Sequence, residues 1–142
     1  MKNIKRIIAL AMVLLSILAV LAACKDESVN PVTLDSLKTA VTEAGYEINF
    51  DSEDNKDVED YKDIFPEELV SWFQFDYGSQ RTVGVYELTD KENADIYAKS
   101  TGGNFLILTN DKFVLMSSGP ESSHSKEEKT FLENLINGRS VK

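Results

Sequence analysis

Ser123 and Lys126 have the Ser-x-x-Lys spacing, which places a lysine amine one helical turn after a serine hydroxyl. Penicillin-binding enzymes use this pair for nucleophilic attack, together with Ser-Asp-Asn and Lys-Thr-Gly elements. Ser-Asp-Asn is absent from the chain, and the nearest sequence to the other element is Lys-Thr-Phe at residues 129–131. Helix capping accounts for the serine more simply, so we do not expect catalysis at this position.

The acidic segment 51–62 has the length of an EF-hand calcium loop. Lys56 stands where the sharp turn needs glycine, and Lys62 stands where the bidentate glutamate belongs. We therefore interpret this segment as a solvated acidic loop, with calcium binding as the alternative. The oxygen-bearing side chains at alternate loop positions are Asp51, Glu53, Asn55, Asp57 and Glu59.

His124 is the only histidine, and it lies in a serine-rich stretch. A zinc site needs several nitrogen or sulfur ligands, so one imidazole does not predict a metal centre. We expect His124 to be a solvated loop residue and expect no metal or other cofactor apart from a covalent lipid, described below.

The 24 acidic residues offer many carboxylates, but no pair is set apart by an apolar context that would separate the two pKa values. Asp76 lies between Phe75 and Tyr77, yet on a strand it would point away from both and into solvent. A small envelope hydrolase, or a hydrolase accessory that uses carboxylates, therefore stays an alternative without a located site.

Aromatic side chains crowd one predicted hairpin, formed by residues 71–78 and 81–88. Alternation places Trp72 and Gln74 on the face opposite Phe73 and Phe75. An exposed tryptophan beside a glutamine would suit recognition of a partner, whereas the alternative is burial of Trp72 in the core. The binding face expected on this basis comprises Trp72, Gln74, Tyr86 and Leu88.

Cys24 is the only cysteine, and it directly follows an apolar run at residues 7–23. Lys2, Lys5 and Arg6 precede this run, and small residues end it. A charged start, an apolar core and small residues at its end are typical of an export signal. A single cysteine cannot form a disulfide within the chain, and a bare thiol is a liability in an oxidising compartment.

The sequence Leu21-Ala22-Ala23-Cys24 resembles the lipobox of bacterial lipoproteins. The resemblance implies a signal peptide at residues 1–23, cleavage between Ala23 and Cys24, and a diacylglyceryl group on the Cys24 sulfur, with a further acyl chain on its amine as an option. Residues 24–33 would then be the lipidated cysteine and a polar tether, and the protein would be anchored in the cell membrane, facing away from the cytoplasm. Two acyl chains hold a protein firmly, whereas one binds only marginally.

Removal of residues 1–23 would take away three of the 15 basic residues and none of the 24 acidic ones, leaving a formal charge of −12. This charge argues against a nucleic-acid partner, which needs a basic patch. We expect a non-enzymatic module of the cell envelope that binds a protein, peptide or envelope component. An acidic inhibitor of a cationic enzyme is a further alternative, because the charge would steer such a partner.

Residues 34–138 are expected to form a single α+β domain in the order α-β-β-β-α-β-β-α. Leucine and valine at helical spacing predict the first helix after Thr33, and Thr-x-x-Glu and Ser-x-x-Glu spacings at residues 89–92 and 125–128 predict the starts of the other two. Alternating runs and turn residues predict hairpins, hence an antiparallel sheet of about five strands. We expect a two-layer sandwich with the helices on one face.

The stretches Glu-Ala-Gly-Tyr-Glu-Ile at residues 43–48 and VGVYELTDKENADIYAK at residues 83–99 also resemble small surface lipoproteins of low-GC Gram-positive bacteria. This resemblance implies a surface lipoprotein. It carries no catalytic motif.

Overall fold

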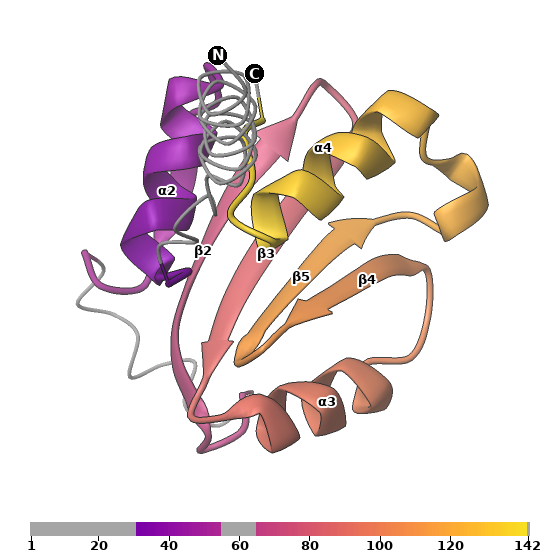
Figure 1. The fold of residues 1–142 in the computed structure, drawn as a ribbon. Helices are drawn as coiled ribbons and strands as arrows, with labels where there is room; N and C mark the ends of the chain where they lie inside the picture. The colour runs from indigo at the N-terminus through magenta and orange to yellow at the C-terminus, as the bar shows by residue number, and fades with distance from the viewer. Residues whose placement is uncertain (1–30, 55–64, 142) are drawn as a thin grey trace, which may run out of the picture. The chain divides into compact units, whose positions relative to one another are not determined.

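Five antiparallel strands form one open sheet in the computed structural model, which describes residues 31–54 and 65–141 (Figure 1). The strands lie in the order β1-β2-β3-β5-β4, and each pairs in antiparallel fashion with its neighbours. The predicted α+β class and element order are confirmed. The elements are α2 (Leu34–Glu43), β1 (Ile48–Asp51), β2 (Leu69–Tyr77), β3 (Arg81–Leu88), α3 (Lys91–Ser100), β4 (Phe105–Asn110), β5 (Phe113–Ser118), a short 3₁₀ helix η2 (Glu121–Ser123) and α4 (Lys126–Ile136).

The helices begin where polar side chains satisfy the first free backbone N–H groups. Thr33 accepts a hydrogen bond from the N–H of Ser36 and caps α2, as predicted. Asp90, rather than the predicted Thr89, caps α3 by accepting from the N–H of Asn93. Thr89 still belongs to the sheet region, because its N–H donates to the carbonyl of Glu68.

The larger core lies between the sheet and the helices α2 and α4. Residues of β2 and β3 that point to this face, such as Phe75 and Val85, pack against Leu37 and Leu132 from the two helices. Val32 and Val141 also pack against this core, so the packed unit extends slightly beyond residues 34–138 at both ends.

The opposite face of the sheet carries a second core beneath α3. Ala94, Tyr97 and Ala98 of α3 pack against a cluster that includes Trp72 and Val114. The expectation that all helices share one face is therefore wrong in this detail. The physical reason is visible in β5, whose residues are apolar on both faces and so need cover on both.

Candidate functional site

The four residues of the expected binding face do lie on one face of the sheet, because Trp72 is paired with Tyr86 in neighbouring strands. Their exposure differs from the expectation. Trp72 is 4% exposed, Tyr86 and Leu88 are buried, and only Gln74 is partly open. The helix α3 and the side chains of Phe50 and Phe65 cover them. The part of this face beneath α3 is thus a second core, and the alternative expectation, burial of Trp72, is the correct one.

The same face is open toward the other end of β2 and β3, beyond the cover of α3. Asp76 is exposed there, as predicted, and its carboxylate is held in place from two sides. Oδ2 accepts from the Asn49 side-chain amide at 2.8 Å, and Oδ1 accepts from the Thr82 hydroxyl at 3.0 Å. Together with Gln74, these side chains form a fixed polar surface, and Asn49 and Thr82 are the members that the sequence pattern did not single out.

Burial between this face of the sheet and α3 raises the pKa of two tyrosines. The pKa of Tyr97 is raised to about 12, first because burial disfavours the phenolate and then because of the charge of Tyr86. Burial likewise raises the pKa of Tyr86, while a hydrogen bond with Gln74 acts in the opposite direction. Both phenols are therefore held neutral well above physiological pH.

We expect the domain to lose stability in alkali as these phenols ionise. A raised folded-state pKa contributes stability that is complete below the ordinary value of 10.0 and is lost as the pH rises toward about 12. Ultraviolet absorbance of tyrosinate, read together with circular dichroism, should show a late titration step that coincides with unfolding. Tyr97→Phe should remove one ionisation from that step. A Tyr97 that titrates near pH 10.0 in the folded protein would contradict the expectation.

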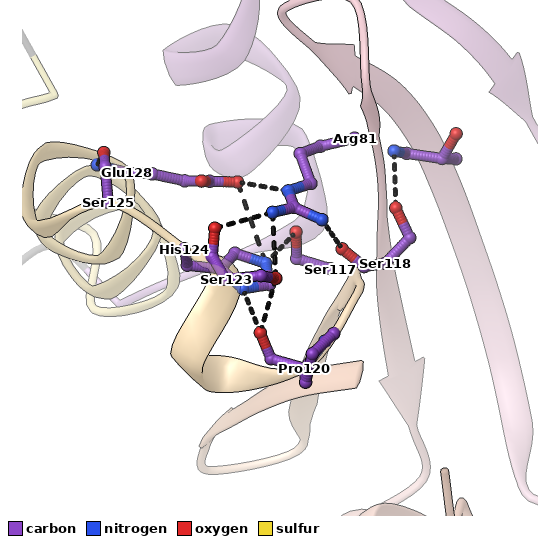
Figure 2. A network of polar contacts seen from close by, with 9 residues as sticks. Arg81, Ser117, Ser118, Pro120, Ser123, His124, Ser125 and Glu128 are labelled. Carbon is purple, nitrogen blue, oxygen red and sulfur yellow. Dashed lines mark hydrogen bonds and ion pairs between the residues drawn. The ribbon is translucent and has the colours of Figure 1, made fainter. Parts of the chain in front are cut away.

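A partly buried polar network joins β3 and β5 to η2 and α4 (Figure 2). Arg81 lies at its centre. One guanidinium nitrogen donates to the Ser118 carbonyl at 3.0 Å, and another donates to the Ser123 carbonyl at 2.8 Å and to its hydroxyl at 2.9 Å. Nε lies 3.4 Å from Oε1 of Glu128, a side chain that is almost fully buried. This Glu128 oxygen has no hydrogen bond among the described residues, so the positive charge of Arg81 is its main compensation.

His124 belongs to this network and is buried, so the expectation of a solvated loop residue is wrong. Its Nδ1 lies 2.9 Å from the Pro120 carbonyl, which can only accept, so we place the ring proton on Nδ1. In the neutral ring, Nε2 then accepts from the Ser117 hydroxyl at 2.9 Å. The short helix η2 folds the loop back over the sheet and brings the imidazole to β5.

Ser117, His124 and Glu128 form a group of the residue types found in hydrolase triads, but the geometry does not fit one. In a triad the acid binds the histidine nitrogen that the serine leaves free. Here Glu128 lies 3.7 Å from Nε2, the nitrogen that meets Ser117, while Nδ1 meets a backbone carbonyl. Ser117 is also 0% exposed, so no substrate reaches its hydroxyl in this structure. The network therefore connects four elements of the fold, and Ser117, His124 and Glu128 do not have the arrangement of a triad.

The Ser-x-x-Lys pair has no nucleophilic arrangement either. The Ser123 hydroxyl donates to the Pro120 carbonyl at 2.7 Å and accepts from Arg81. Lys126 is exposed. The cap of α4 is Ser125, which accepts from the N–H of Glu128, so capping explains Ser125 and the contact with Arg81 explains Ser123.

The start of the candidate calcium loop lies at the end of β1, whereas residues 55–62 lie outside the described part of the chain. Lys38 of α2 places its ammonium 2.7 Å from the Asp51 carboxylate and also binds Glu53. Burial alone would lower the pKa of Lys38, but hydrogen bonds and charge from the two carboxylates outweigh it and raise this pKa. Two of the candidate calcium ligands are thus already paired with a cation of the chain itself, which balances one of their two negative charges.

The residues of the lipobox resemblance, including Ala23 and Cys24, lie outside the described residues, as does the tether up to residue 30. Within the described ranges, no helix has the length and apolar character needed to cross a bilayer. Across residues 31–54 and 65–141, no three histidine, cysteine or acidic side chains are grouped so that they could hold a metal ion.

Comparison of the chain with protein-family models, with curated proteins and with solved structures found no match.

Proposed function

We propose that the protein is a lipid-anchored lipoprotein of a bacterial cell membrane, and that its folded domain is a binding module held outside the cytoplasm. The observation that carries this proposal is the position of the only cysteine, directly after an export-signal pattern and within Leu21-Ala22-Ala23-Cys24. Attachment of two or more acyl chains at Cys24 would hold the domain at the membrane.

The geometry of the folded part is compatible with this arrangement. Packing against the core begins at Val32, so seven residues separate Cys24 from the folded unit. Seven residues span at most about 25 Å, which is greater than the Debye length of about 8 Å. An acidic domain on such a tether can stay clear of an anionic membrane surface. The fixed polar surface around Asp76 is our candidate for contact with a partner.

We expect the native protein to partition into the detergent-rich phase of a phase-separating detergent, and Cys24→Ser to partition into the aqueous phase or to keep its signal segment. Mass spectrometry of the native protein should give a chain that begins at Cys24 and carries a diacylglyceryl group. Ser28→Ala, a short way farther along the tether, should behave as the native protein does and is the matched control. A native protein with an unmodified thiol would overturn the proposal.

A further inference from the structure

The two edges of the sheet are built differently. The edge strand β1 has four residues, contains Asp51, and has a register shift around Asn49 that interrupts its pairing with β2. The other edge strand, β4, has six residues of sequence FLILTN and pairs with β5 without a register shift. Proteins ordinarily protect edge strands with charges, prolines, bulges or short length. The edge at β1 has such protection, and the edge at β4 has none of it.

Backbone pairing shows which groups of β4 point outward. The Leu88 N–H donates to the Lys112 carbonyl, so the backbone N–H and C=O groups of the even-numbered residues of β5 point toward β3. The Gly119 N–H donates to the Asn104 carbonyl, so the odd-numbered residues of β5 exchange backbone hydrogen bonds with the even-numbered residues of β4. The N–H and C=O groups of the remaining β4 residues therefore point away from the sheet, where no described strand pairs with them. These residues are Phe105, Ile107 and Thr109.

We propose that the outer edge of β4 pairs with the same edge of a second copy of this chain, so that two five-stranded sheets join into one. One register satisfies every outward group. An antiparallel pair centred on Ile107 places it opposite its own copy and places Phe105 opposite Thr109 of the other copy. The three residues then exchange six main-chain hydrogen bonds across the two-fold axis. A shift by two residues in either direction leaves only four.

The side chains fit the same register. Phe105, Ile107 and Thr109 share one face of the sheet, so the pairing keeps like faces together. Phe105 is 41% exposed and would gain cover from the neighbouring strand. No residue of β4 is charged, so the edge itself contributes no repulsion. The formal net charge of −9 opposes the approach of two copies, and this opposition weakens as salt is added.

Cysteine cross-linking of the full-length chain tests the register. Residues opposite each other in a hydrogen-bonded pair have Cα atoms about 5.5 Å apart, within the range of a disulfide. We expect Phe105→Cys and Thr109→Cys chains, produced together, to form a mixed disulfide dimer. Either variant alone should form no more disulfide dimer than the unaltered chain does, because like positions lie about 13 Å apart in this register. The unaltered chain, oxidised in parallel, reveals any dimer that forms through Cys24.

Sedimentation of the full-length chain tests the association itself. The native chain should dimerise, more strongly at higher salt, and Thr109→Pro should stay monomeric because it removes an outward N–H while leaving the bonds to β5 intact. Thr109→Val keeps that N–H and should dimerise normally. Absence of the mixed disulfide would overturn the proposal. So would equal cross-linking of either variant alone, or a native chain that sediments as a monomer because its edge is unused or takes a strand from a different protein.

Discussion

Replacement of Arg81 by methionine should lower the free energy of unfolding by about 3–5 kcal/mol, the usual cost when one partner of a buried ion pair is removed. The carboxylate of Glu128 would keep its buried position and lose the cation that lies 3.4 Å away. The carbonyls of Ser118 and Ser123 would lose their donors at the same time. Chemical denaturation followed by circular dichroism measures the change.

A second substitution separates charge from packing in this network. Arg81→Met combined with Glu128→Leu leaves no unpaired charge, so it should recover a large part of the stability lost in the single variant. Lys91→Met removes the cation of the exposed pair with Asp95, and it should change stability little. If Arg81→Met were as mild as Lys91→Met, the network would not stabilise the fold as we infer.

Trp72→Ala should destabilise the domain by about 3–5 kcal/mol, the range for truncation of a large buried aromatic side chain. The indole lies edge-on to Phe50 at a centroid distance of 4.2 Å and to Phe65 at 5.2 Å, and it also meets Tyr86. Its loss would open a cavity beneath α3. Thermal unfolding followed by circular dichroism should show a fall of about 10 °C or more in the midpoint.

Val70, which lies two residues before Trp72 in β2, provides the control. Val70 is 58% exposed, so Val70→Ala should change stability by no more than about 0.5 kcal/mol. Trp72→Phe keeps an aromatic ring in the site and should fall between these two variants. Full stability of Trp72→Ala, together with loss of a partner, would restore the interpretation of Trp72 as a surface contact.

Local patterns were sufficient to predict most of the fold. The spacing of Leu34, Leu37 and Val41 predicted α2, and Thr33 predicted its start, because helix periodicity and capping involve residues within one or two turns. Alternation in β2 separated Trp72 from Phe73 correctly, because side chains on a strand point to opposite faces whatever covers them. The placement of α3 was missed although a signal existed. β5 is apolar without alternation, which indicates cover on both faces.

The polar network could not be predicted in this way. Arg81 begins a strand and His124 lies in a serine-rich stretch, and neither residue has a neighbour in sequence that marks it as a member of a network. Their contacts join positions up to 42 residues apart, and only the packing of η2 against β3 and β5 brings them together. The polar surface around Asp76 has the same origin, because Asn49 reaches it from a strand 27 residues earlier in the chain.

The strand β3 lies between two separate cores, and consecutive residues belong to different ones. Val85 packs with α2 and α4, whereas Tyr86 packs beneath α3. Insertion or deletion of one residue within β3 would therefore move each later side chain of the strand from one core to the other. A change of length in the largely exposed loop at residues 101–104, between α3 and β4, would by contrast leave both cores intact. Gain and loss of residues during evolution should thus be confined to such loops, and the length of β3 should be fixed from both sides at once.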